Sequence, residues 1–196
     1  MNLPNKLTMM RVVLVPVFMV FAALAKYGTA DFNATFSLVA GIIFTVASIT
    51  DFLDGYIARK NHLVTDFGKF MDPLADKCLT TAAFIYMVVD GVCSPIVLAV
   101  ILFREFAVAG VRMIAAETGT VIAANMWGKA KTVSQIVAVI VALVLQIVLK
   151  LGGFSAEVSG SFGIITNVVV WVSVIFTIIS GIVYLKDNAD LYKNAK

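Results

Sequence analysis

Apolar residues dominate this chain in long runs, and polar residues gather in the short stretches between the runs. Six of these runs are near the roughly 20 residues that an α-helix needs to cross a bilayer. Lipid offers no partners to free backbone groups, so helices are the expected form. The predicted spans cover residues 7–25, 35–58, 68–89, 95–116, 132–151 and 162–185, the first beginning at Leu7 or Arg11. Residues 1–11 are mixed, which is typical of a short interfacial segment before the first span.

The composition supports the same interpretation. Hydrophobic residues make up 61% of the 196 residues and charged residues 14%, with a mean hydropathy of +0.98. Soluble domains average about 45–50% apolar and about 25% charged residues. We therefore predict an all-α integral membrane protein with six transmembrane helices, forming a single membrane-embedded domain over residues 1–196. No nucleic-acid partner is expected.

Basic residues are distributed unevenly between the two predicted sides of the membrane. The side that holds both termini has eleven, which are Lys6, Arg11, Arg59, Lys60, Lys69, Arg112, Lys129, Lys131, Lys186, Lys193 and Lys196. The other side has two, Lys26 and Lys150. Because Lys and Arg concentrate in cytoplasmic loops, we expect the termini and residues 51–76 at the cytoplasmic face of the cell membrane.

Four aspartates stand at the ends of two apolar runs, within DFLDGYIARKNHLVTDFGKFMDPLAD at residues 51–76. Positions three or four apart share one helix face. The two faces carry Asp51, Asp54, Gly55 and Ala58 on one helix, and Gly68, Asp72 and Asp76 on the next. Four acids crowd together only when protons or cations neutralise them, and all-oxygen ligation suits Mg²⁺, Mn²⁺ or Ca²⁺. We predict a one- or two-metal site. The alternative of simple interfacial caps does not account for the shared faces and their small neighbours.

The eight fixed positions from Asp51 to Asp76 fill the pattern D-x2-D-G-x2-A-R-x8-G-x3-D-x3-D. This pattern resembles the signature of the CDP-alcohol phosphotransferase family, and the resemblance implies that family's six-helix fold over most of the chain. Within the family, the chain looks like the branch that uses sn-glycerol 3-phosphate as acceptor. That likeness rests on NLPNKLTMMR, VTDFGKFMDPLADK, REF at residues 104–106 and GTVIAAN…GKAKT.

The resemblance implies that CDP-diacylglycerol donates its phosphatidyl group to the primary hydroxyl of glycerol 3-phosphate, and that CMP leaves. It implies two divalent cations, Mg²⁺ or Mn²⁺, a homodimer, and Asp76 as the general base. The cations on Asp51, Asp54, Asp72 and Asp76 would neutralise the pyrophosphate. The expected contacts to CDP-diacylglycerol are Asn5, Thr8, Gly55, Ala58, Arg59 and Gly68. We expect the diacylglycerol tails to enter laterally from the bilayer, near the second and fifth spans.

A second group of charges lies in the later part of the chain. Arg104 lies deep in the fourth span beside Glu105, and intramembrane charges are functional candidates by default. Arginine suits bidentate phosphate binding, and lysine acts as a point charge. The predicted pocket for the glycerol phosphate consists of Lys60, Arg104, Arg112, Lys129 and Lys131. Two alternatives stay open: Arg104 as the structural partner of a carboxylate, and Lys60 and Arg11 as contacts for anionic headgroups.

Two other functions also stay open at this point. A sister enzyme would use the same donor with serine, inositol phosphate or another lipid as acceptor, and the aspartate pattern does not separate these. The basic residues favour a phosphorylated acceptor over serine. A divalent-cation transporter would use the aspartates as its ion site, but both acid pairs lie toward one membrane face and the sequence has no paired broken helices.

Overall fold

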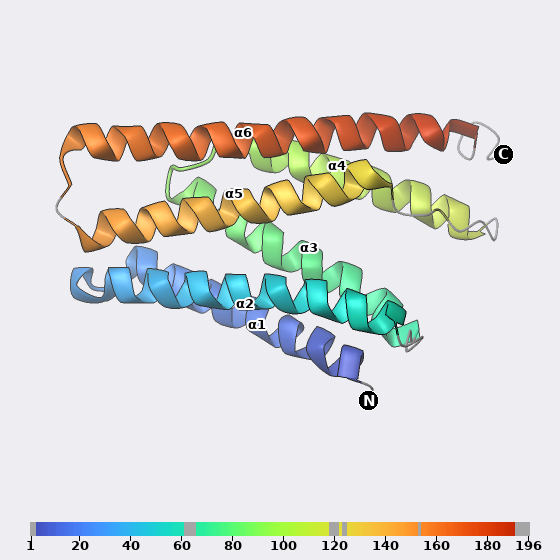
Figure 1. Cartoon of the computed structure of the whole chain (residues 1–196), viewed down its shortest axis with the longest axis horizontal. Coiled ribbons are helices and arrows are strands. Elements are labelled where there is room, and N and C mark those ends of the chain that lie inside the picture. The colour runs from blue at the N-terminus through green and yellow to red at the C-terminus, as the bar shows by residue number, and fades with distance from the viewer. Residues whose placement is uncertain (1–2, 61–65, 118–121, 123–124, 153, 191–196) are drawn as a thin grey trace.

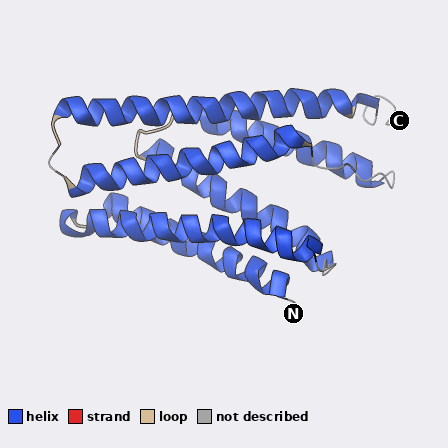
Figure 2. Cartoon of the chain, in the orientation of Figure 1, coloured by secondary structure: helices blue, strands red, loops and turns tan. Residues whose placement is uncertain are grey.

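The computed structural model of the chain is all-helical over the residues that it describes (Figure 2). These are residues 3–60, 66–117, 122, 125–152 and 154–190, although the side chains of 3–5, 30, 52–60, 66–74, 76, 117 and 156 lie outside the description. The helices are α1 (Leu3–Tyr27), the short 3₁₀ turn η1 (Ala30–Phe32), α2 (Asn33–Lys60), α3 (Asp66–Val89), α4 (Pro95–Glu117), α5 (Met126–Leu151) and α6 (Ala156–Asp187), as Figure 1 shows.

The six long helices agree with the six predicted spans. Four of the described stretches are long and apolar enough to cross a membrane: Lys6–Tyr27, Asn33–Asp51, Met126–Leu151 and Glu157–Asp187. The described part of α3 adds a shorter apolar stretch, Lys77–Val89. In α4 the charges of Arg104, Glu105 and Arg112 interrupt the apolar run.

The outward faces of the helices are apolar, as a lipid environment requires. Val13 in α1 and Ile164 in α6 expose 59% and 67% of their surface. In α4, Phe103 is 75% exposed, whereas the neighbouring side chains of Arg104 and Glu105 are only 12% and 13% exposed. Arg104 and Glu105 therefore point into the bundle, and the apolar face of α4 points out. The prediction of an all-α, multi-pass membrane protein is confirmed.

α1 and α2 form one antiparallel pair and α5 and α6 another, while α3 crosses the bundle obliquely (Figure 1). The start of α1 and the end of α6 lie at the same end of the bundle as the end of α2 and the starts of α3 and α5. Lys26 and Lys150, predicted for the opposite side, lie at the other end. There Lys26 Nζ is 3.2 Å from Asp90 Oδ1, and Lys150 Nζ donates to the Ala25 carbonyl at 3.3 Å. These two lysines thus lie together at the end of the bundle opposite the aspartate helices, as predicted.

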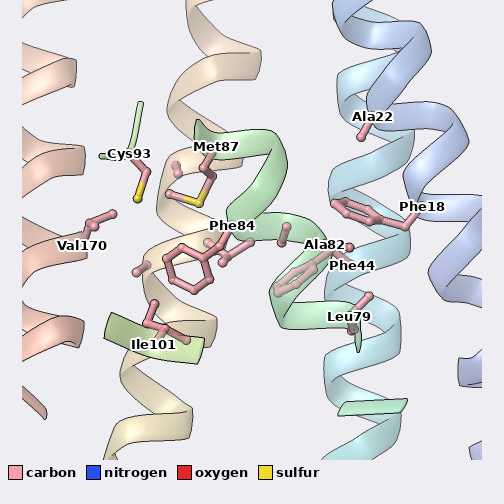
Figure 3. Packing of buried hydrophobic residues seen from close by; sticks show 14 of the residues in the cluster. Phe18, Ala22, Phe44, Leu79, Ala82, Phe84, Met87, Cys93, Ile101 and Val170 are labelled. Atoms are coloured by element: carbon pink, nitrogen blue, oxygen red, sulfur yellow. The ribbon is translucent and has the colours of Figure 1, made fainter. Parts of the chain in front are cut away.

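The core is centred on Phe84 of α3, which is completely buried where α3 crosses its neighbours (Figure 3). Phe18 of α1 and Phe44 of α2 belong to the same core and pack against each other, with their ring centres 5.9 Å apart. Small residues such as Ala82 let the helices approach closely. Cys93, in the turn after α3, joins this core, and burial raises the pKa of its thiol to about 11. The thiol therefore stays protonated and packs as a small apolar group.

The fifth helix begins earlier than the apolar pattern predicts. α5 begins at Met126 rather than at Thr132. The cause is a cap: the Asn125 side chain accepts a hydrogen bond from the Gly128 backbone N–H at 2.8 Å, which satisfies one of the free donors of the first turn. The correction places Lys131 inside the helix, so its direction is fixed by the helix.

The sixth helix and the N-terminal segment also differ from the prediction. α6 begins at Ala156 rather than at Phe162, and Ser155 caps it by accepting from the Val158 backbone N–H. The predicted interfacial segment is not a separate element, because α1 is continuous from Leu3. Both helices therefore extend beyond their most apolar stretches.

Candidate active site

The predicted aspartates lie on the two helices that the pattern required. α2 carries Asp51, Asp54, Gly55, Ala58, Arg59 and Lys60, and α3 carries Gly68, Asp72 and Asp76. Both helices are continuous through these positions, so each acid pair keeps its three- or four-residue spacing on one helix. Of this set the structure describes only the side chain of Asp51. The roles predicted for the others, and for Asn5 of α1, lie outside the described side chains.

Asp51 is held by a buried arginine from the first helix. Arg11 Nη1 lies 2.7 Å from Asp51 Oδ1, and the Arg11 side chain is 1% exposed whereas that of Asp51 is 34% exposed. Thr8, one turn before Arg11, is also buried. The first turns of α1 are therefore packed against the aspartate helix. Arg11 supports Asp51 instead of facing anionic headgroups, and the donor contact of Thr8 stays a prediction.

The chemistry of Asp51 fits the predicted hard cation. A carboxylate has two oxygens with about four lone-pair positions, so it can accept from an arginine and ligate a metal at once. Its partial exposure keeps it within reach of an ion from solution. Among the described side chains, no three His, Cys, Asp or Glu residues gather into a metal cage. The other three predicted ligands are outside that set, so the metal site stays a prediction.

Glu105 of α4 is surrounded by basic side chains from three helices. Lys131 of α5 donates to Oε1, Arg104 Nη1 donates to the same oxygen at 3.2 Å, and Lys77 Nζ of α3 lies 3.7 Å from Oε2. The side chains of Lys131 and Glu105 are only 8% and 13% exposed. Among the described side chains, three cations and one carboxylate leave an excess of two positive charges, which favours an added anion such as phosphate. Lys77 directly follows Asp76, so this cluster adjoins the second aspartate helix.

Arg104 is also fixed by α6. Its Nη2 donates to Ser180 Oγ at 2.7 Å, and a Cβ at Gly181 would come within 3.1 Å of Arg104 Cγ. Glycine at 181 therefore makes room for the arginine. Two turns further along α4, Arg112 Nε donates to Tyr184 Oη at 3.3 Å, and its guanidinium lies 5.8 Å from the ring centre. Both arginines therefore contact α6.

The structure separates the two lysines near the start of α5. Lys131 lies on the buried stripe of the helix, together with Gln135 and Ala138. Lys129 is two residues earlier, about 200° around the helix, and its side chain is exposed. The structure therefore brings Arg104 and Lys131 together at Glu105 and does not bring Lys129 there. Lys60, the remaining member of the predicted pocket, is outside the described side chains.

Three residues of the site were not among the predicted ones: Glu105, Arg11 and Lys77. An acid inside an apolar helix requires cationic partners, so the position of Glu105 already marked it as the centre of a charge cluster. Arg11 lies three residues after Thr8, on the same face of α1, which was a weaker signal. Neither signal identifies the partner helix, because helical periodicity contains no information about contacts between helices.

Apolar grooves between α2 and α5 lead toward the aspartates. Two grooves of about 260 Å³ each share Thr45 and Ile140, so they form one track along the two helices. The track includes Ser48, three residues before Asp51 and on the same face of α2. It coincides with the predicted lateral path for the diacylglycerol tails.

A bundle of apolar helices, with an acidic motif on two of them and a buried basic cluster beside it, defines a membrane-embedded protein with a polar site at one end. The chain belongs to the CDP-alcohol phosphatidyltransferase family, whose model matches residues 1–179. It is similar to the CDP-diacylglycerol–glycerol-3-phosphate 3-phosphatidyltransferase of Bacillus subtilis, with 41% identity over 99% of this chain and 98% of that protein. Proteins of the same name from Rickettsia bellii and Rickettsia felis are 34% and 36% identical, over 94% of each chain.

We expect Glu105→Leu to destabilise the protein strongly. The substitution removes the only carboxylate that the described side chains offer to Lys131 and Arg104, and removing one partner of a buried charge pair costs about 3–5 kcal/mol. The free energy of unfolding in detergent is the measurement. Asp90→Asn is the matched control, because its pair with Lys26 is partly exposed and is worth about 1 kcal/mol or less. An equal loss of unfolding free energy in the two variants would contradict the role of Glu105 as the buried partner of Lys131 and Arg104.

Proposed function

We propose that this protein transfers the phosphatidyl group of CDP-diacylglycerol to sn-glycerol 3-phosphate, giving phosphatidylglycerophosphate and CMP. The observation that carries the proposal is the adjacency of two charged sites: the acid pattern on α2 and α3, and the net-positive cluster at Glu105, joined through Lys77. A reaction between an anionic donor and a phosphorylated acceptor needs both. The shared name of the relatives supports this acceptor.

The two sites have complementary tasks in this reaction. Arg104 and Lys131 would bind the phosphate of the acceptor, the arginine through a pair of hydrogen bonds and the lysine as a point charge. Asp76 would take the proton of the acceptor's primary hydroxyl. The hydroxyl oxygen then forms a bond to the phosphorus that bears diacylglycerol, and the bond from that phosphorus to the CMP oxygen breaks.

The aspartates Asp51, Asp54, Asp72 and Asp76 would hold one or two divalent cations, Mg²⁺ or Mn²⁺. When bound, these cations supply charge neutralisation for the pyrophosphate of the donor. Arg11 fixes the direction of the Asp51 carboxylate through their 2.7 Å contact. The apolar track between α2 and α5 would take the diacylglycerol tails and leave the nucleotide near Asp51.

We also propose that the protein lies in the cell membrane with its active site open to the cytoplasm. Support comes from the positions of basic residues: Lys26 and Lys150 lie at one end of the bundle, and the end of α2 and the start of α3 lie at the other. CDP-diacylglycerol would then reach the site from the bilayer, and glycerol 3-phosphate from the aqueous side.

A homodimer is the assembly that we propose. Support comes from α4, where exposed residues recur at alternating three- and four-residue steps. They are Ile96, Ala99, Phe103, Phe106, Gly110 and Met113. This spacing is typical of a seam between two helices, and a small residue such as Gly110 permits close approach. A Cβ at Gly110 would meet no heavy atom within 4 Å, so that side of α4 is open to a second copy.

The purified protein is expected to release CMP from CDP-diacylglycerol when glycerol 3-phosphate is added, and not with serine or inositol phosphate. Stripping divalent cations with EDTA should abolish the release, and Mg²⁺ or Mn²⁺ should restore it, because the donor's pyrophosphate needs neutralisation. Radiolabelled CMP release, measured with each acceptor in turn, is the assay. Turnover with serine alone would replace this proposal by a sister activity.

The acceptor site is checked in the same assay with two lysine variants. Lys131→Ala should raise the KM for glycerol 3-phosphate at least tenfold, since a charged hydrogen bond contributes about 1.5–3 kcal/mol. Lys186→Ala removes an exposed lysine at the end of α6 and should leave the KM unchanged. An unchanged KM in Lys131→Ala would remove this residue from the acceptor site.

Asp76→Asn is expected to lower kcat by at least a hundredfold with little change in KM, because general-base catalysis contributes about 10²–10⁴ in rate. Single-turnover kinetics of CMP release, at saturating Mg²⁺ or Mn²⁺, measure the effect. Metal binding is followed in parallel by calorimetry. If the variant binds metal and turns over near the wild-type rate, Asp76 is not the base.

The dimer seam predicts a specific cross-link. In a Cys78→Ala background, Phe106→Cys should form a covalent dimer on mild oxidation in native membranes, because residues of the seam face their counterparts in the second copy. Non-reducing electrophoresis detects the product. Ile182→Cys, on the exposed face of α6, is the matched control and should stay monomeric. Cross-linking of Ile182→Cys alone would place the interface on α6 instead.

A further inference from the structure

Lys129 lines a groove that takes no part in the reaction proposed above. The groove lies between the outer faces of α5 and α6 and has a volume of about 440 Å³. Its lining includes Met126, Lys129, Val133, Val137, Val172 and Phe176. This volume is within the usual range of roughly 300–1,000 Å³ for sites that bind small molecules.

The groove has a charged end and an apolar length. Lys129, Val133 and Val137 are four residues apart in turn, so they form one stripe along α5. At 1.5 Å per residue the stripe is about 12 Å long. Beyond Lys129 the stripe and the facing residues of α6, Val172 and Phe176, are apolar. A cation followed by an apolar track matches a phosphate headgroup followed by an acyl chain.

The local charges favour an anion at this end. α5 begins here, and the positive end of its helix dipole coincides with Lys129 in the first turns. The first turn contains no acidic residue. Trp127 is 41% exposed in the same turn, and tryptophan is enriched at the level of lipid headgroups. The charged end of the groove is therefore suited to the headgroup region of the bilayer.

We infer that the α5–α6 groove binds one anionic phospholipid, with an acyl chain between α5 and α6 and the headgroup phosphate at Lys129. This site differs from the track for the donor tails, which lies between α2 and α5, and from the acceptor cluster at Lys131. Val133 and Val137 line both grooves and form the ridge between them. An anionic lipid would thus bind on one side of α5, while the donor CDP-diacylglycerol enters on the other side.

The experiment uses a tryptophan placed in the groove. Phe176→Trp is made in a chain that also carries Trp127→Phe and Trp171→Phe, and the variant is first checked for native melting temperature. It is reconstituted in vesicles that contain phosphatidylcholine and a minor share of phosphatidylglycerol, with bromine on the acyl chains of one or the other lipid. Bromine quenches a nearby tryptophan, so the two quenching curves give the relative affinity of the groove for the two lipids.

We expect about a fivefold preference for the brominated phosphatidylglycerol, which corresponds to the effect of one lysine near the membrane surface. Lys129→Ala should abolish the preference, whereas Lys186→Ala should keep it. Equal quenching by the two lipids, or a preference that survives Lys129→Ala, overturns the inference.

Two competitors separate the remaining occupants. CDP-diacylglycerol should relieve the quenching no better than the same mole fraction of unbrominated phosphatidylglycerol; if it does so at a much lower mole fraction, the groove holds the donor's second tail. Millimolar glycerol 3-phosphate should not relieve the quenching; if it does, Lys129 belongs to the acceptor site, as predicted from the sequence. Either result overturns the inference of a separate lipid site, and neither depends on turnover.

Discussion

The position of Glu105 inside a membrane helix is the constraint on which the surrounding structure depends. A lone carboxylate at this depth is strongly unfavourable, so the bundle must bring cations to it. Lys77, Arg104 and Lys131 do so from α3, α4 and α5, and Arg104 extends the network to Ser180 of α6. Among the described side chains, this cluster holds three positive charges and one negative charge. These contacts connect four helices at one end of the bundle and, within the described part of the chain, leave an excess of positive charge.

α5 separates the lipid from the polar site. Its buried stripe carries Lys131 and Gln135, which contact Glu105 and Thr177, and its outer stripe carries Lys129. The Asn125 cap starts the helix just before these residues and thereby fixes which lysine faces which way. A helix beginning at Thr132 would have left both lysines in a loop with no defined direction. The assignment of two chemically similar residues to different surfaces thus follows from a single capping hydrogen bond.

The number and type of the helices follow from the sequence because apolar runs of spanning length have one stable form in lipid. The acid pattern on α2 and α3 follows in the same way from helix periodicity. The starts of α5 and α6 were misplaced because Asn125 and Ser155 stand in less apolar segments, where capping outweighs hydropathy. The pair of Arg11 and Asp51 could not be predicted, since it depends on how α1 packs on α2. The same reason applies to the three cations at Glu105. The sequence shows that these residues are basic, but their convergence on one carboxylate depends on how α3, α4 and α5 pack.

The pair of Arg11 and Asp51 bears on how a divalent cation would act here. Asp51 already has a cationic partner at 2.7 Å, supplied by a buried side chain of α1. Arg11 therefore neutralises the Asp51 carboxylate where α1 packs on α2, so this packing does not require a bound metal. A cation that binds at the aspartates as proposed would then act mainly on the substrate's pyrophosphate and less on the fold. Removing the metal should therefore abolish turnover without unfolding the protein. This outcome distinguishes a catalytic ion from a structural one.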